Sequence, residues 1–326
     1  MPATERLSMA MYCTGCIPGY QLPCFAGETE DIFRRHDLSI EILDPLPQAE
    51  NIIAVAEGRN DLCLTSVAHF VKARSENPDL GARFVFMVAR QSHMGAFVVR
   101  GRKDADGHRI KKHRDLGGAS VLGDPDSAFG REYTTLLGRL GLATGPWVDV
   151  PYPDIMRALA EGKADVAADF VDLLPRFQAV ADPLGVRIDV MPFHEAGIDI
   201  YGSGLVASTR MLRERPQTVR AAVAAFQEAL LASQENPALG LEALIDHVPG
   251  ADPGLVVAGW QAGSALIFDA ETTALGTMNA EKWRRTLEYH ADAYGGARDI
   301  DVDSVFDGSV LAGGDAEGAP AALDVR

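Results

Sequence analysis

The sequence is poor in cysteine and in basic residues, and each shortage excludes a class of protein. Four cysteines in 326 residues are too few for a disulfide-stapled extracellular scaffold. Thirty lysines and arginines stand against 46 aspartates and glutamates, which gives a net charge of −16. A chain this acidic is a poor candidate for nucleic-acid binding, because phosphates need a basic surface. Its overall charge also gives no reason to expect an anionic membrane as a partner.

Long apolar runs are absent as well. No stretch of about 18 or more apolar residues occurs, so we expect no transmembrane segment. The first residues, MPATERLSMAMYC, lack a basic segment followed by an apolar one, so no signal peptide is expected. If Met1 is the true start, this predicts a cytoplasmic protein. If the N-terminus is truncated, a periplasmic or extracellular location is expected instead.

A repeated phrase gives the clearest sign of internal organisation. AVAEGRNDLCLTSVAHF spans residues 54–70, and ALAEGKADVAADFVDLL spans residues 158–174. Each phrase has the end of a helix, a Glu-Gly-basic sequence, an aspartate and an apolar run typical of a buried strand. Gly58 and Gly162 suit the position just after a helix, where a positive φ is needed. We therefore predict two similar α/β lobes, with a chance likeness between two helix–strand loops as the alternative.

The order of the expected elements predicts an α/β protein with two lobes, in which mixed sheets are flanked by helices. Strands and helices alternate, which is typical of parallel sheets with right-handed crossovers. The sequence YGSGLVAS is expected to be a strand that returns to the first lobe. The predicted lobes are 1–99 with 205–311, and 100–204, followed by a disordered tail at 312–326. A cleft between hinged lobes is then the expected ligand site.

The segments in this order resemble a known family. They are LSMAMYCTGCIPGY, the two repeated phrases, YGSGLVASTRMLRERPQTVRAAVAAFQEAL, and MNAEKWRRTLEYHADAYGGARDIDVDSVFDGSVL. Together they are similar to the type II solute-binding proteins of bacterial ABC importers, in the group for nitrate, sulfonate, taurine and thiamine-pyrimidine precursors. The resemblance spans Leu7 to Leu311. It implies the type II periplasmic-binding-protein fold, hinge closure around a small organic molecule, and an importer permease as partner.

The same group includes cytoplasmic enzymes, and these supply an alternative function. The chain resembles an aromatic sulfinate desulfinase in having a cysteine just after the first strand, which would be Cys16 or Cys13. That likeness implies a cysteine-dependent desulfinase or another C–S or C–C lyase, with Cys16, Cys13 and His69 as catalytic residues. The Arg-x-Gly-Gly loop of the desulfinase is replaced here by KARSENPDLG, which favours binding over catalysis.

The stretch MAMYCTGCIPGYQLPC holds three of the four cysteines. Cys13 and Cys16 have the Cys-x-x-Cys spacing, but no second such pair or histidine pair accompanies them, so we expect no metal. No cofactor is expected either. A redox pair would sit at the start of a helix, whereas this pair lies in a predicted loop. Contact with a ligand and packing as small apolar side chains both stay open for this pair, and packing is expected for Cys24 and Cys63.

Candidate ligand-binding residues follow from the rule that ligands of open α/β sheets bind beyond the carboxyl ends of the strands. The residues expected there are Tyr12, Cys13, Cys16, Tyr20, Ser66, His69, Gln91, Ser92, Met94, Asp124, Ser127, Phe129, Arg131, Asp169, Tyr201 and Ser203.

The chemistry of these residues indicates a kind of ligand. The rings of Tyr12, Tyr20, Phe129, Phe170 and Tyr201 offer stacking surfaces. Residues 127–130 are expected at a helix N-terminus that could hold an anion, and a plain helix cap by Asp126 or Ser127 is the alternative. We therefore predict an aromatic or heterocyclic ligand, with a sulfonate, sulfinate or carboxylate group as an option.

Overall fold

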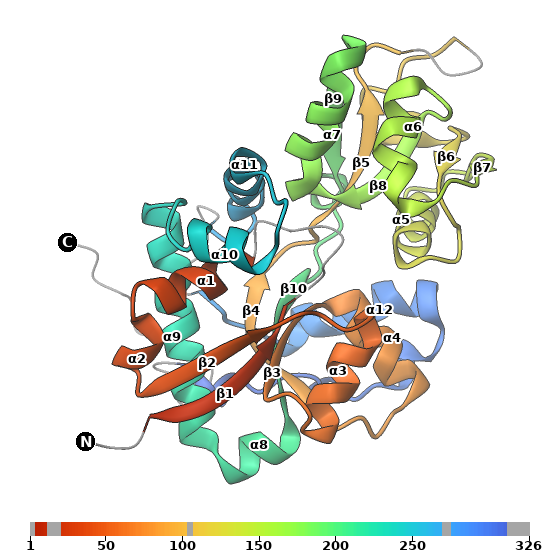
Figure 1. Ribbon diagram of the computed structural model, residues 1–326. Helices are drawn as coiled ribbons and strands as arrows, with labels where there is room; N and C mark the ends of the chain where they lie inside the picture. Colours follow the sequence, from red (N-terminus) through yellow and green to blue (C-terminus); the bar gives the residue numbers. More distant parts are fainter. Residues whose placement is uncertain (1–3, 12–20, 103–106, 269–274, 312–326) are drawn as a thin grey trace. The chain divides into compact units, whose positions relative to one another are not determined.

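The computed structural model describes residues 4–11, 21–102, 107–268 and 275–311 (Figure 1). The chain forms two compact units: Met1–Arg90 with Tyr201–Arg326, and Gln91–Ile200. The sequence placed the boundaries after residues 99 and 204. Both boundaries fall earlier in the structure, after residues 90 and 200. The first one moves because the strand over residues 94–99 pairs with strands of the second unit.

The first unit contains a five-stranded mixed sheet. Its order is β2-β1-β3-β10-β4, and its strands are β1 (Glu5–Ala10), β2 (Leu38–Leu43), β3 (Leu62–Ser66), β4 (Ala82–Ala89) and β10 (Ser203–Ser208). β1 runs parallel to β2 and β3, whereas β10 runs antiparallel to β3 and β4. The prediction that YGSGLVAS returns to the first lobe is therefore confirmed.

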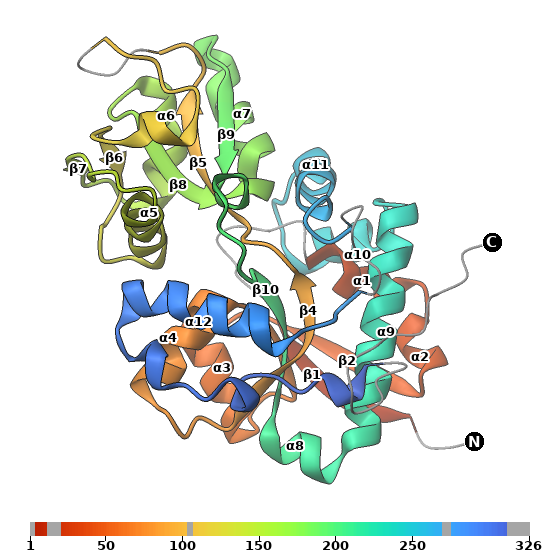
Figure 2. The same cartoon turned by 180° about the vertical axis from the view of Figure 1, so that it is seen from behind.

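Nine helices of this unit lie in the described ranges, and each of them buries apolar residues. They are α1 (Leu22–Thr29), α2 (Ile32–Arg35), α3 (Gln48–Glu57), α4 (Val67–Glu76), α8 (Thr209–Glu214), α9 (Pro216–Glu235), α10 (Leu241–His247), α11 (Pro253–Ser264) and α12 (Ala280–Tyr294). α9 begins at Pro216, where the missing N–H of proline costs no helical hydrogen bond. α12 packs against α4, as Figure 2 shows, and brings Trp283 into the core.

The second unit repeats the plan on a smaller scale. Its sheet has the order β7-β6-β8-β5-β9, with β5 (Met94–Val99), β6 (Val121–Leu122), β7 (Trp147–Val148), β8 (Val166–Phe170) and β9 (Ile188–Pro192). β6 runs parallel to β7 and β8, and β5 runs antiparallel to β8 and β9. The helices are α5 (Ala128–Arg139), α6 (Ile155–Glu161) and α7 (Leu174–Ala181). None of the helices in the described ranges combines the length and the apolar character that crossing a bilayer requires.

The repeated phrase corresponds to the same helix-to-strand unit in both halves. Gly58 follows α3 with φ of 77°, and Gly162 follows α6 with φ of 79°, so both predicted helix ends are confirmed. The guanidinium of Arg210 lies over Gly58, and that of Arg102 lies over Gly162. Arg102 donates to the carbonyl oxygens of Leu159 and Ala160 at 2.8 and 2.9 Å, which satisfies orphan acceptors at the end of α6.

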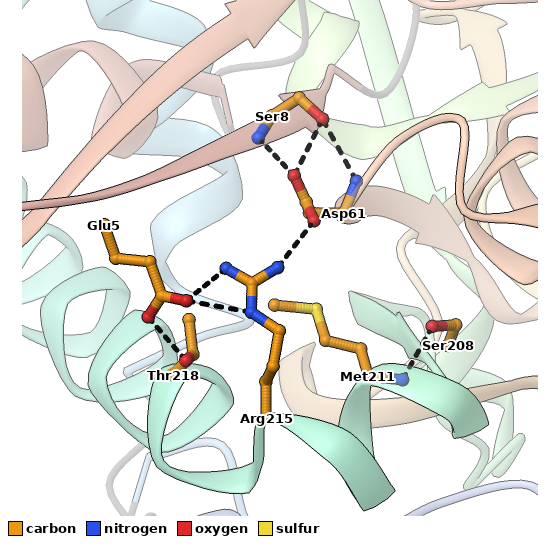
Figure 3. Close-up of polar contacts among 7 residues, drawn as sticks. All are labelled: Glu5, Ser8, Asp61, Ser208, Met211, Arg215 and Thr218. Atoms are coloured by element: carbon orange, nitrogen blue, oxygen red, sulfur yellow. Dashed lines mark hydrogen bonds and ion pairs between the residues drawn. The ribbon is translucent and has the colours of Figure 1, made fainter.

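The aspartate that comes three residues after each of these glycines forms reciprocal hydrogen bonds with a serine. In the first unit, the amide and hydroxyl of Ser8 donate to Asp61 Oδ2 at 2.9 and 3.2 Å, and the Asp61 amide donates back to Ser8 Oγ at 3.1 Å (Figure 3). In the second unit, Ser120 and Asp165 make the same three bonds at 3.0, 2.5 and 3.1 Å. We call these pairs the Ser–Asp clamps. The first clamp ties β1 to the start of β3, and the second ties the start of β6 to the start of β8.

The first clamp is part of a larger network. Asp61 also pairs with Arg215 at 3.4 Å, and Arg215 pairs in turn with Glu5 (Figure 3). The hydroxyl of Thr218 donates to Glu5 at 2.5 Å, and this bond, with Arg215, lowers the pKa of the Glu5 carboxyl. The start of α9 is thereby tied to the start of β1.

Removing a clamp carboxylate should destabilise the protein measurably. For Asp165→Ala and for Asp61→Ala we expect the free energy of unfolding to fall by about 2 kcal/mol, because the amide and hydroxyl of the serine lose a charged acceptor. The two effects should add in the double variant, because the clamps lie in separate units. Urea unfolding measures this, with the exposed Asp303→Ala as a control expected to change stability by less than about 0.5 kcal/mol. Clamp variants that behave like the control would contradict the prediction.

Candidate ligand-binding site

In each unit, the carboxyl ends of the parallel strands lie at one edge of the sheet. The candidate residues of the described ranges are at or just beyond these strand ends. In the first unit, Ser66 ends β3 and lies opposite Ser203, where β10 begins. The amide of Val67 donates to Gly202 at 2.8 Å, and the amide of Gly202 donates to Ala89 at the end of β4. The structure therefore brings the predicted Ser66 and Ser203 together at the same edge.

Ser66 holds His69 in a defined state. The Ser66 hydroxyl caps α4 by accepting the His69 amide at 3.2 Å, and it lies 2.6 Å from His69 Nδ1. Burial, with smaller contributions from Lys72 and His290, lowers the pKa of His69 to about 4. The ring is therefore neutral at neutral pH. The arrangement that satisfies the Ser66 hydroxyl is donation to Nδ1, which places the ring proton on Nε2.

The other ring nitrogen of His69, Nε2, is buried and has no hydrogen-bond partner among the described residues. His69 is 6% exposed, and within the described ranges no hydrogen-bond partner reaches Nε2. Buried polar atoms in folded proteins nearly always have a partner. His69 thus presents a neutral N–H donor, and its predicted role as a ligand contact stays a prediction.

Tyr201 does not have the role that the sequence suggested. Its side chain is 1% exposed and belongs to the core, with its ring 5.2 Å from that of Trp283. Its hydroxyl accepts the Asn279 amide at 2.9 Å. The expectation that Tyr201 offers a stacking surface to a ligand is therefore corrected, because tertiary packing buries the ring.

The cysteines divide into two groups. Tyr12, Cys13, Cys16 and Tyr20 lie outside the described residues, so the predictions for them, including the catalytic alternative, stay predictions. Cys24 and Cys63 are fully buried, as expected for packing, and burial raises the pKa of Cys24 to about 12 and that of Cys63 still further. In the described part of the chain, no group of three or more His, Cys, Asp or Glu side chains is placed to hold a metal ion.

At the second unit's edge, the start of α5 is capped by Ser127 of the same chain. Ser127 Oγ accepts the Gly130 amide at 3.0 Å and donates to the Asp124 carbonyl at 2.6 Å. Asp124 Oδ1 accepts the Asp126 amide, and Arg131 pairs with Asp126 at 3.0 Å. The plain cap that the sequence left open for Ser127 is the arrangement found, and the predicted anion site at residues 127–130 gains no support from this geometry.

Aromatic rings gather beside this helix start. Phe129 lies face to face with Tyr152, with ring centroids 5.7 Å apart and an interplanar angle of 13°. The edge of Phe170 meets Phe129 at 5.0 Å, and His93 lies 4.3 Å from Phe170. Phe129 is half-buried and Tyr152 is 37% exposed, so this pair has ring surface available for contact. We call Phe129 and Tyr152 the aromatic platform.

A buried carboxylate lies under the platform. Asp169 is 1% exposed, and its Oδ1 accepts the Phe170 amide at 2.8 Å and lies 3.4 Å from the Tyr152 hydroxyl. Sequence reasoning found Phe129, Phe170 and Asp169 but missed Tyr152 and His93. The signal for Tyr152 was its place in the loop after the strand WVDV, where the rule that selected the other residues applies equally.

The remaining candidates surround the start of β5. Met94 lies opposite Phe170 in the sheet, and the Ser92 hydroxyl accepts the Met94 amide at 3.3 Å. Ser92 and Met94 are buried, whereas Gln91 is half-buried. The structure therefore places Gln91, Ser92 and Met94 at the same edge as the platform.

Comparisons with known proteins agree on one architecture. A family model described as NMT1/THI5 like matches residues 19–239. The periplasmic aliphatic sulphonate binding protein SsuA of Escherichia coli superposes with a TM-score of 0.69 at 16% identity, covering 99% of this chain and 94% of that one. The alkanesulfonate-binding protein SsuA of Xanthomonas axonopodis pv. citri, solved with MOPS bound, gives 0.62 at 14%, covering 95% and 99%.

A third structure superposes with a lower TM-score than these two. A Candida albicans gene product described as having the generic periplasmic binding protein fold gives a TM-score of 0.58 at 11% identity, covering 91% of each chain. No curated protein matches the sequence at a significant level. At these identities the structural matches establish the fold, which is that of the periplasmic binding proteins.

Proposed function

The chain belongs to the NMT1/THI5-like family, and from that premise we propose that it binds one small organic molecule as the solute-binding component of an ABC importer. The sulfonate-binding proteins that share its fold support this proposal. The permease of the importer would be its protein partner. A component of this kind acts outside the cytoplasm, so we propose a periplasmic or extracellular location, which fractionation of cells expressing the native gene would test.

The aromatic platform is the observation that carries the proposal. Ligand sites in proteins combine apolar and aromatic walls with a few placed polar groups. Phe129 and Tyr152 provide the wall, and Asp169 provides a buried acceptor beside it. A planar ring could stack on the exposed part of the platform, with a ring N–H or hydroxyl directed at the carboxylate.

The other candidates stay predictions of ligand contacts. They are Ser66, His69 and Ser203 in the first unit, and Gln91, Ser92, Met94, Asp124, Ser127 and Arg131 in the second. The cleft between lobes that the sequence predicts is likewise a proposal. An oxygen of a sulfonate, sulfinate or carboxylate could accept the N–H of His69.

Binding should depend on the platform. A thermal-shift screen with benzenesulfonate, benzenesulfinate, benzoate, nicotinate and aliphatic sulfonates would find a ligand, and calorimetry would give its Kd. Phe129→Leu and Tyr152→Ala should each weaken binding of the best compound about tenfold, because a stacked ring contributes about 0.5–1.5 kcal/mol beyond its buried area.

Phe306→Leu is the matched control. Phe306 is also a half-buried aromatic residue, but it stacks on Trp283 in the core of the first unit. This variant should bind the compound as the parent does, even if it is less stable. Equal losses in Phe129→Leu and Phe306→Leu would refute the platform as the site, and a screen without any bound compound would argue against the function.

A further inference from the structure

One short segment reverses the charge of the protein locally. Residues 107–114, GHRIKKHR, contain four of the chain's 30 lysines and arginines and none of its 46 acidic residues. The rest of the chain therefore carries a net charge of −20. We call this segment the basic strip. It lies in the connection between β5 and β6, which is orange to yellow in Figure 1.

The four cations of the basic strip are exposed and unpaired. Arg109, Lys111, Lys112 and Arg114 all lie at the surface, and within the described ranges none of them forms an ion pair. Some other cations of the same unit have acidic partners: Arg100 pairs with Asp189, and Arg131 pairs with Asp126. Clustered like charges repel one another, so the fold itself gains nothing from this arrangement.

The backbone of the strip is held in place. The amides of Lys111 and Lys112 donate to Asp115 Oδ2 at 3.0 and 3.1 Å. His113 Nε2 lies 2.9 Å from the carbonyl oxygen of Pro192, and Leu116 is buried. Two aspartates flank the strip in the sequence, Asp106 and Asp115, and the carboxylate of Asp115 is engaged by these backbone amides. The cations project from an anchored segment, which keeps them together at the surface.

We propose that the basic strip is a docking surface for an anionic phospholipid bilayer. Clusters of four or more lysines and arginines are typical of segments that bind acidic headgroups, and arginine suits a phosphate through paired N–H donors. A flat bilayer meets only the surface turned toward it, so the negative charge elsewhere would orient the molecule with the strip facing the lipid.

A nucleic acid fits the strip less well. The strip contains no Phe, Tyr or Trp on which unpaired bases could stack. A polyanion longer than the strip would also run along a surface whose net charge is strongly negative. The negative net charge argues against an anionic partner for most of the surface. The basic strip is positively charged, so this argument does not apply to it.

Vesicle co-sedimentation tests the proposal. The full chain is mixed with vesicles of phosphatidylcholine and phosphatidylglycerol, or of phosphatidylcholine alone, at low salt. We expect binding to the anionic vesicles only, and its loss at high salt, because salt screens the attraction. The double variant Lys111→Glu/Lys112→Glu should lower the partition coefficient at least about tenfold.

The control double variant is Arg220→Glu/Arg284→Glu. Both arginines are exposed and have no ion pair within the described ranges, and the control changes the net charge by the same amount. It should bind the vesicles as the parent does. The proposal is overturned if the parent does not bind anionic vesicles, if both double variants lose binding equally, or if a DNA oligonucleotide displaces the vesicles from the strip.

Discussion

Replacing Trp283 with alanine is expected to lower the free energy of unfolding of the first unit by about 3–5 kcal/mol. Trp283 is fully buried on α12 and lies among the rings of Phe84, Tyr201 and Phe306, with centroids 5.3, 5.2 and 6.2 Å away. The substitution removes a large apolar side chain and leaves a cavity that these rings cannot fill. Urea unfolding followed by circular dichroism gives the change.

Trp147→Ala provides the comparison for Trp283→Ala. Trp147 lies on the edge strand β7 of the second unit and is half-buried. Its loss should therefore cost less, about 1–2 kcal/mol, because less apolar area returns to water. If Trp283→Ala cost no more than Trp147→Ala, α12 would not be part of the first unit's core.

The second large effect concerns acid stability. His69 has its pKa lowered to about 4, mainly by burial, against an ordinary value of 6.5. The unfolded chain therefore takes up a proton at this residue below pH 6.5 that the folded protein does not take up until about pH 4. Stability is fully present above pH 6.5 and is lost as the pH falls through this window, by about 3 kcal/mol in all.

The variant His69→Gln should remove this dependence. Glutamine keeps a polar side chain beside Ser66 but does not titrate. We expect the difference in unfolding free energy between the parent and His69→Gln to shrink by about 3 kcal/mol from pH 7 to pH 4, measured by urea unfolding at both values. Parallel pH profiles for the two proteins would show that His69 is not held neutral by burial.

The two partners of each Ser–Asp clamp differ in how far the sequence reveals them. The repeated Glu-Gly-basic-x-Asp phrase is enough to locate Gly58, Gly162, Asp61 and Asp165, because a glycine after a helix and the strand behind it leave a local pattern. The serine partners, Ser8 and Ser120, leave no such pattern. Each lies 53 or 45 residues from its aspartate, so only the parallel pairing of the strands identifies them.

By itself the sequence determined the family, the alternating α/β order, the helix ends at two glycines, and the return of β10 to the first sheet. These features depend on periodicity and on backbone conformation over a few residues. Tertiary structure decided where β5 pairs, because a strand's partner is not encoded within the strand. It also decided that Tyr201 belongs to the core and that Tyr152 faces Phe129, because both outcomes depend on residues distant in the chain. The same holds for His69: its sequence neighbours permit either charge state, and the burial created by packing selects the neutral one.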